Sequence, residues 1–120
     1  MKDKKALGRL GEKIASSLLQ RRGYKIIDKN FQCRLGEIDI VALDHDALVF
    51  VEVKARVGKR FGLPEEAVRP WKIKSIEKVG NYFRLLYPDT PELQRIDVVA
   101  VELDETGKVL RQELIKNVGV

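Results

Sequence analysis

Apolar residues recur every three or four positions in two segments of the chain, which is the spacing of an amphipathic helix. The first segment covers residues 3–22 and is followed by Gly23, a residue that often ends a helix. The second begins at Pro70, which suits the first turn of a helix, and reaches about Leu86, since Pro88 prevents its continuation. The pattern predicts two helices.

Shorter apolar stretches, bounded by turn-forming residues, predict five strands. Three lie between the two helices and two follow the second helix, at residues 24–28, 38–43, 48–55, 95–103 and 108–116. A helix between the third and fourth strands is typical of a right-handed crossover that joins parallel neighbours. The order α-β-β-β-α-β-β therefore predicts an α/β fold, a mixed sheet with helices against its faces.

The second and third strands form the most apolar hairpin of the chain. A two-residue loop at His45 and Asp46 places Asp44 opposite Ala47 and fixes the register of every later pair. One face of this hairpin is then wholly apolar and must be buried. That face consists of Ile38, Ile40, Ala42, Val49, Val51 and Val53.

The opposite face of the hairpin is apolar near the turn and charged at its far end. The same register places Asp39 opposite Glu52 and Glu37 opposite Lys54. Two like charges in opposed positions destabilise a strand pair, and burial beside a core adds to the cost. A divalent cation, a shared proton or neighbouring Lys and Arg side chains would compensate. The alternative is an ordinary ion pair at a solvated edge of the sheet.

Two carboxylates with a lysine beside them suit metal-assisted hydrolysis of a phosphodiester. Asp39 and Glu52 would hold Mg²⁺ or Mn²⁺, with the backbone carbonyl of Val53 as a third oxygen ligand. Such a metal activates water and neutralises charge on the phosphorus. Lys54 would hold the phosphate or the attacking water and stabilise the developing anion.

Glu12 lies at the edge of the apolar stripe of the first predicted helix. It either reaches the charged end of the sheet or stays at the surface, where it pairs with Arg9 or Ser16. Both interpretations stay open at this point. Gly8 and Gly11 lower the stability of an isolated helix, and they would allow it to approach the sheet or a substrate backbone closely.

The formal net charge of +5 and a pI near 9.4 point to an anionic partner, nucleic acid first. Trp71 and Tyr82 either stack on bases or belong to the rim of the core. The basic side chains that we expect to contact DNA flank the charged end of the hairpin or lie off the apolar stripe of the second helix. They are Arg34, Arg56, Lys59, Arg60, Lys72 and Lys74, with Lys78 as a further member of the second group. Each of them singly is better explained as a solvated surface charge.

A chain of 120 residues is expected to form a single domain, residues 1–120. No apolar run approaches the roughly 20 residues that cross a bilayer, and the basic N-terminal segment has no apolar stretch behind it. We therefore expect a cytoplasmic protein without a membrane partner. Cys33 has no second cysteine to pair with and is expected to be a small, half-buried hydrophobe.

The stretches "GEIDIVA", "LVFVEVKAR" and "GRLGEKIASSLLQRRGYKII" together resemble the YraN-type family of small bacterial proteins. More loosely, they resemble archaeal Holliday junction resolvases, and both groups belong to the PD-(D/E)xK nuclease superfamily. The resemblance continues through "FGLPEEAVRPWKIKSI" and "RIDVVAV". It implies a restriction-endonuclease-like fold, a three-layer sandwich, and an Mg²⁺- or Mn²⁺-dependent endonuclease.

The resemblance also implies roles for individual residues. Asp39 matches the first acidic metal ligand, Glu52 the second, and Lys54 the catalytic lysine. Glu12 matches an acid on the first helix of the resolvase branch. The proline of the motif is absent, since Ile38 precedes Asp39. The resolvase resemblance further implies a homodimer, because two symmetric cuts need two sites.

We therefore expect a metal-dependent enzyme that hydrolyses phosphodiester bonds of DNA, branched or otherwise structured DNA in particular. Two other functions fit the sequence. A non-catalytic nucleic-acid-binding module would keep its DNA behaviour after Asp39→Asn. A small scaffold that binds another DNA-processing protein would show no salt-dependent affinity for DNA.

Overall fold

The computed structural model describes residues 3–58 and 62–119. The order of its elements differs from the predicted order only by an added 3₁₀ helix, η1, before the second α-helix. The elements are α1 (Lys4–Arg21), β1 (Lys25–Cys33), β2 (Gly36–Asp44), β3 (Ala47–Val57), η1 (Pro64–Ala67), α2 (Pro70–Leu86), β4 (Leu93–Leu103) and β5 (Val109–Ile115). Among the described residues, no helix has the length and apolarity needed to cross a membrane.

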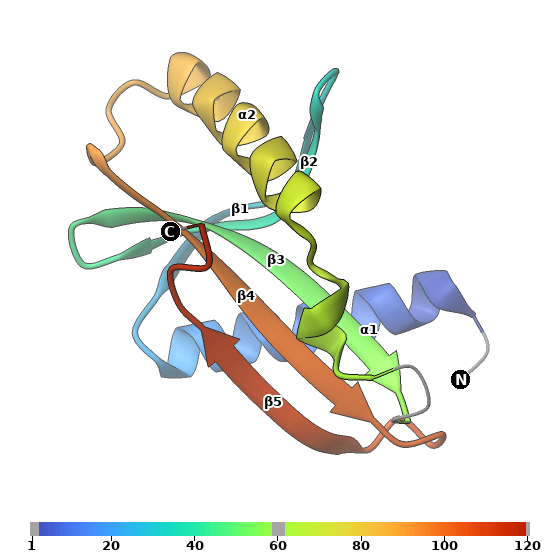
Figure 1. Ribbon diagram of the computed structural model, residues 1–120. Coiled ribbons are helices and arrows are strands. Elements are labelled where there is room, and N and C mark those ends of the chain that lie inside the picture. The colour runs from blue at the N-terminus through green and yellow to red at the C-terminus, as the bar shows by residue number, and fades with distance from the viewer. Residues whose placement is uncertain (1–2, 59–61, 120) are drawn as a thin grey trace.

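The five strands form one mixed sheet in the spatial order β1-β2-β3-β4-β5 (Figure 1). Strand β2 is antiparallel to both β1 and β3, β3 and β4 are parallel, and β5 is antiparallel to β4. Helix α2 lies in the connection between the two parallel strands, as the crossover argument predicts.

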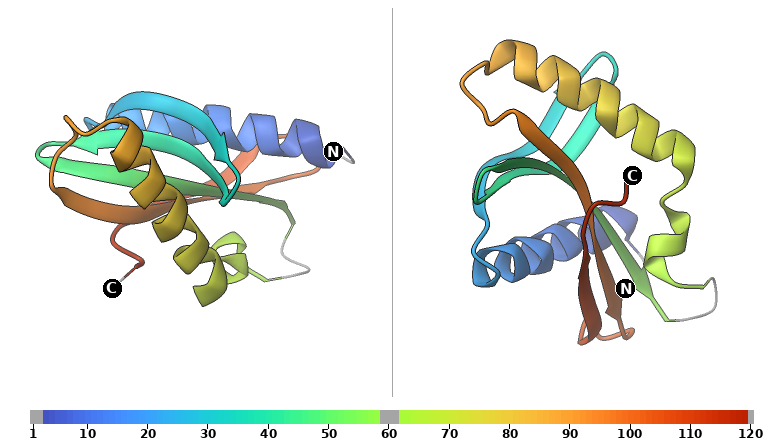
Figure 2. Two further views of the ribbon diagram at one scale, coloured as in Figure 1. Left: turned by 90° about the horizontal axis from the view of Figure 1, so that it is seen from above. Right: turned by 60° about the vertical axis from the view of Figure 1, so that its left-hand side comes forward.

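The two helices cover opposite faces of the sheet, which gives three layers (Figure 2). Each helix buries most of the apolar stripe that its sequence predicts, although Leu86 at the end of α2 is 50% exposed. The burial of each large side chain stabilises the fold by roughly 1.5–3 kcal/mol. The buried residues of α1 in this packing are Ala15, Leu18 and Leu19, and those of α2 are Ile76, Val79 and Phe83. Asp3 caps α1, because its side chain accepts a hydrogen bond of 2.9 Å from the N–H of Lys5.

Helix α2 lies so close to the sheet that position 80 requires glycine. A Cβ atom at Gly80 would lie 2.4 Å from the ring of Phe50, which is itself fully buried on β3. Gly8 is the contrasting case, since a Cβ atom there meets nothing within 4 Å. Only one of these two helical glycines is therefore explained by packing.

Strand β1 is longer than predicted, since it ends at Cys33 rather than at residue 28. Its second half is mostly polar and gives no apolar alternation, so the pattern contained no signal for it. The backbone nevertheless pairs with β2, with Phe31 opposite Ile38 and Cys33 opposite Gly36. A register shift between Ile26 and Asp28 marks a bulge in this strand.

Ile38 lies in a different part of the core from the one predicted. It packs with the buried residues under α2, whereas Ile40 and Ala42 pack under α1. The cause is the course of the β1–β2 hairpin, whose tip curls toward α2 (Figure 1). A Cβ atom on Gly36 would lie 3.2 Å from the hydroxyl of Ser75 and 3.4 Å from Val79. The residues of the predicted apolar face are therefore split between the two sides of the sheet, with Ile38 on the side of α2.

We expect Gly80→Ala to lower the free energy of unfolding by about 1–3 kcal/mol, because the added methyl group overpacks the contact with Phe50. Gly8→Ala is the matched control, and it should raise the free energy of unfolding by up to about 1 kcal/mol, since alanine is the better helix former. Urea unfolding of both variants measures the difference. Equal effects of the two substitutions would contradict the packing argument.

Candidate functional site

The backbone pairing of β2 with β3 follows the predicted register from the Asp44–Ala47 pair as far as the Ile40–Val51 pair. One residue further along, the contact with β3 is made by the side chain of Asp39 and not by the backbone of β2. Its Oδ2 atom accepts a hydrogen bond of 2.8 Å from the N–H of Val53. The predicted ladder thus ends just before the acidic residues, and a carboxylate lies where the next backbone contact would be.

Asp39 and Glu52 contact each other through their side chains. The Glu52 carboxyl group donates a hydrogen bond to the Asp39 carboxylate. Burial raises the pKa of Glu52 to about 8, and the neighbouring charge of Asp39 adds to the rise. Burial also raises the pKa of Asp39, although its hydrogen bond from Val53 opposes this. Glu52 therefore keeps its proton at neutral pH.

Two lysines surround the acidic pair. The Nζ atom of Lys72, on the first turn of α2, lies 3.7 Å from Oε2 of Glu52. Lys54 lies on the same face of β3 as Glu52, and its charge lowers the pKa of that carboxyl group. Of the three compensations expected for the acids, a shared proton and neighbouring cations are both present. Lys72 was identified from the sequence only as a DNA-contact residue, because its spacing gave no link to Glu52.

Glu12, on α1, lies close enough to Asp39 for the two charges to interact. The side chain of Asn30 donates a hydrogen bond to its carboxylate. Burial raises the pKa of Glu12, and the charge of Asp39 raises it further. Gly11 makes the approach possible, since a Cβ atom there would lie 2.8 Å from Cβ of Ala55 on β3. The close approach expected of the glycines is thus found at Gly11, whereas nothing lies within contact distance of a Cβ atom at position 8.

The alternative partners considered for Glu12 are not used in the described part of the chain. Ser16 is buried, yet its hydroxyl oxygen has no hydrogen-bond partner there. Arg9, Glu12 and Ser16 line a shared groove on α1 that also includes Lys29 and Asn30. Asn30 was missed as a site residue because it falls beyond the predicted end of its strand.

The alternative interpretation, an ordinary ion pair between Glu37 and Lys54, is wrong for the described residues. Within residues 3–58 and 62–119, the hydrogen-bond partner of the Glu37 carboxylate is the side-chain amide of Gln32, at 3.2 Å. Gln32 is opposite Glu37 in the β1–β2 ladder. The error has a physical origin, because the pairing of β2 with β3 ends at Ile40 and β2 continues with β1 alone.

The donor set at this point of the sheet fits a hard divalent cation. In a strand, the N–H and C=O groups of one residue point to the same side, so the carbonyl of Val53 faces the same gap as its N–H bonded to Asp39. Two carboxylates and this carbonyl would then converge. No cluster of three or more Asp, Glu, His or Cys side chains with ligand geometry exists among the described residues, so a third protein ligand has to come from the backbone.

Residues 11–101 match the family described as "Uncharacterised protein family UPF0102". The chain belongs to the UPF0102 family. It is 46% identical over 114 residues to a UPF0102 protein of Syntrophus aciditrophicus, covering 92% of this chain and 85% of that protein. A UPF0102 protein of Caldicellulosiruptor bescii is 44% identical over 114 residues, with 94% and 96% of the two chains covered. One of Arthrobacter is 40% identical over 119 residues, with 99% and 100% covered.

The resemblance to the YraN-type family is thereby confirmed, since that family and UPF0102 are the same. The range that matches UPF0102 contains Glu12, Asp39, Glu52 and Lys54, together with Lys72. It therefore includes every residue that the structure brings to the acidic pair.

The basic residues expected to contact DNA occupy different environments in this UPF0102 member. Arg34 and Lys74 are exposed, whereas Lys72 is partly buried against Glu52. Arg56 is partly buried and lies beside Glu102 in the β3–β4 register. Lys59 and Arg60 lie outside the described residues.

A second acidic cluster, around Asp97, has its hydrogen bonds satisfied by the fold itself. This residue is completely buried and accepts hydrogen bonds from Arg95 at 2.9 Å, from the Tyr24 hydroxyl at 2.7 Å and from the N–H of Asn117 at 3.0 Å. Arg95 also donates to Asp44 at 2.7 Å. The cluster ties the start of β1, the end of β2 and β4 together, and this role is structural.

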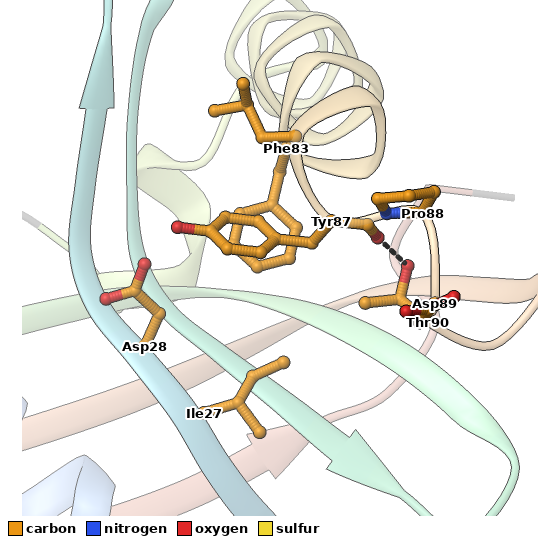
Figure 3. A pocket seen from close by; sticks show the side chains of 8 residues that line it. Ile27, Asp28, Phe83, Tyr87, Pro88, Asp89 and Thr90 are labelled. Carbon is orange, nitrogen blue, oxygen red and sulfur yellow. Dashed lines mark hydrogen bonds between the residues drawn. The ribbon is translucent and has the colours of Figure 1, made fainter.

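A separate pocket of about 540 Å³ lies between β1 and the end of α2 (Figure 3). The rings of Tyr87 and Phe83 form one wall, with their centroids 4.6 Å apart. The hydroxyl of Thr90 donates a hydrogen bond of 2.9 Å to the carbonyl of Tyr87, which fixes the turn after the helix (Figure 3). None of the predicted site residues lines this pocket, so it is distinct from the acidic pair.

The raised pKa of Glu52 predicts a pH-dependent stability. The folded protein holds a proton that the unfolded chain loses near the ordinary value of 4.5, so the free energy of unfolding falls as the pH rises from there toward about 8. We expect a fall of roughly 1 kcal/mol per pH unit in this window, and a flatter profile for Glu52→Gln, which cannot ionise. Urea unfolding across this pH range measures both profiles. The exposed Glu92 offers a control, since Glu92→Gln should leave the profile unchanged, and equal slopes for all three proteins would refute the assignment.

Proposed function

We propose that this UPF0102 protein is a metal-dependent nuclease that hydrolyses phosphodiester bonds of DNA. The observation that carries the proposal is the pair of neighbouring acids, the half-buried Asp39 and the buried Glu52, flanked by Lys54 and Lys72. Carboxyl groups of raised pKa gather at functional sites, and this pair supports the proposal in that way.

The same proposal assigns the chain to the restriction-endonuclease-like fold of the PD-(D/E)xK superfamily, as one domain over residues 1–120 and in the cytoplasm. It is supported by the mixed sheet with a helix on each face and by the position of both acids at the junction of β2 and β3. Cleavage of a symmetric branched substrate would in addition require a homodimer.

Asp39, Glu52 and the carbonyl of Val53 would hold Mg²⁺ or Mn²⁺. When bound, such an ion supplies an activated water and neutralises charge on the scissile phosphate. Loss of the proton shared by Asp39 and Glu52 frees both carboxylates for this role, so metal affinity rises with pH. Glu12 adds a third acid at the edge of the site and can orient water there.

Lys54 and Lys72 would act on the phosphate of the substrate. Lys54, on the same face of β3 as Glu52, donates hydrogen bonds to the phosphate or the attacking water and stabilises the anion that develops. Lys72, whose Nζ atom lies 3.7 Å from Oε2 of Glu52, adds a second positive charge beside the scissile group. Arg34 and Lys74 are exposed and bind phosphates further along the strand.

We expect purified protein to cut labelled DNA in Mg²⁺ or Mn²⁺ and not in EDTA. The substrates are single-stranded, duplex, flapped and four-way-junction DNA. Asp39→Asn and Lys54→Ala should each lower the cleavage rate by at least about a hundredfold, in line with the loss of an electrostatic catalytic group. Asp46→Asn, at the exposed hairpin turn, is the matched control and should keep wild-type activity.

Circular dichroism of each variant separates loss of function from loss of fold. Folded wild type that binds DNA without cutting it under any of these conditions would favour the non-catalytic nucleic-acid-binding module instead. Cleavage that persists in folded Asp39→Asn would contradict the assignment of the site.

We expect Mn²⁺ or Mg²⁺ to raise the melting temperature of the wild-type protein, because a ligand that binds only the folded state stabilises it. A free metal concentration of a hundred times Kd corresponds to about 2.7 kcal/mol. Asp39→Asn should lose the shift, Asp46→Asn should keep it, and EDTA should reverse it. A shift of the same size in Asp39→Asn would place the ion elsewhere.

A further inference from the structure

A groove of about 470 Å³ runs between the exposed side of α2 and the turn that joins β1 to β2. Trp71 and Leu35 supply its apolar surface, and they are 69% and 54% exposed. Its other lining residues are polar or basic, namely Arg34, Lys74, Ser75 and Lys78. The groove contains none of the acidic residues of the candidate site.

Trp71 is neither a core residue nor a rim residue. Its side chain faces solvent on the first turn of α2, while its chain neighbour Lys72 is partly buried against Glu52. Successive residues of a helix point about 100° apart, so this turn presents one residue to the acidic pair and the other to the groove. A large aromatic ring left in water at this position is available for a ligand.

The charge of the groove restricts what that ligand is. Arg34, Lys74 and Lys78 give it three positive charges, and the described residues that line it include no acid. A ligand that matches this surface has anionic groups alternating with flat apolar faces. A strand of nucleic acid has this chemistry, because phosphates pair with Lys and Arg while bases stack on aromatic rings.

The accessible ring further requires that the base be unpaired. In duplex DNA the faces of the bases are covered by their neighbours in the stack, so an aromatic side chain on an exposed helix cannot reach them. Binding modes that use stacking are therefore typical of single strands. The residues that line the groove come from the β1–β2 turn and the first half of α2.

We propose that this groove binds an unpaired segment of a DNA strand, with one base stacked on Trp71 and the adjoining phosphates held by Arg34, Lys74 and Lys78. The proposal rests on the function proposed above and deepens it, since it assigns the substrate class. DNA with a single-stranded segment next to the cut would be favoured over a continuous duplex.

The test uses the fact that Trp71 is the single tryptophan of the chain. Its fluorescence therefore reports on this groove alone. We expect an oligothymidylate, titrated in EDTA so that no cleavage occurs, to quench the emission and to bind with a salt-dependent affinity. A duplex of the same length should quench far less.

Substitutions test the aromatic part and the basic part of the groove separately. Trp71→Ala should weaken oligothymidylate binding, measured by fluorescence anisotropy, roughly five- to hundredfold. Leu85→Ala, at an exposed residue of the same helix outside the groove, should have no effect. Lys74→Ala should lower the slope of log affinity against log salt by about 0.7, whereas Lys108→Ala, in the β4–β5 connection, should leave it unchanged.

Three results would overturn the proposal: no binding, binding that leaves the emission unchanged, or equal quenching by the duplex. None of these depends on catalysis. Asp39→Asn, which removes the proposed nuclease activity, should quench as the wild type does, so a failed nuclease and a failed groove give different results.

Discussion

One hydrogen bond, from the N–H of Val53 to the carboxylate of Asp39, determines the geometry of the candidate site. It ends the pairing of β2 with β3, because a side chain now occupies the position of the next backbone acceptor. It holds Asp39 against Glu52 on the adjacent strand. It also directs the carbonyl of Val53 into the same gap. Both helices then approach this point, α1 through Gly11 and α2 through Lys72.

The contrast between the two acidic clusters shows why this point differs from the rest of the core. Asp97 is buried with an arginine, a tyrosine hydroxyl and a backbone N–H as donors, so its charge is compensated by the fold itself. Asp39 and Glu52 instead face each other, and the nearest cation, Lys72, is 3.7 Å away. Burial without full compensation is costly, and the cost appears as the raised pKa values of both groups. A structural role for the pair would favour an arrangement like that of Asp97.

The sequence predicted the elements that are defined by the spacing of apolar residues and by glycine and proline at their ends. Helix α2 has the predicted limits, and the hairpin register is correct as far as Ile40. The features that the sequence could not predict depend on the path of the strands in three dimensions. The polar half of β1 is a strand only because β2 supplies its backbone partners. Ile38 packs under α2 instead of α1 because the β1–β2 hairpin curls toward α2. Lys72 and Lys74 look alike in the sequence, yet one contacts Glu52 and the other lines the exposed groove.

Helix α2 presents one side to the acidic pair and another to the groove, so it fixes how these two sites lie relative to each other. Residues two apart on a helix point about 200° away from each other, so the sequence "WKIKS" places Lys72 toward the sheet and Trp71 and Lys74 toward the groove. The contact of Gly80 with Phe50 holds α2 at a fixed distance from β3, the strand that carries Glu52 and Lys54. The spacing between groove and acids is therefore set by the packed core, not by flexible loops. A strand bound at Trp71 would be held at a constant offset from Asp39 and Glu52.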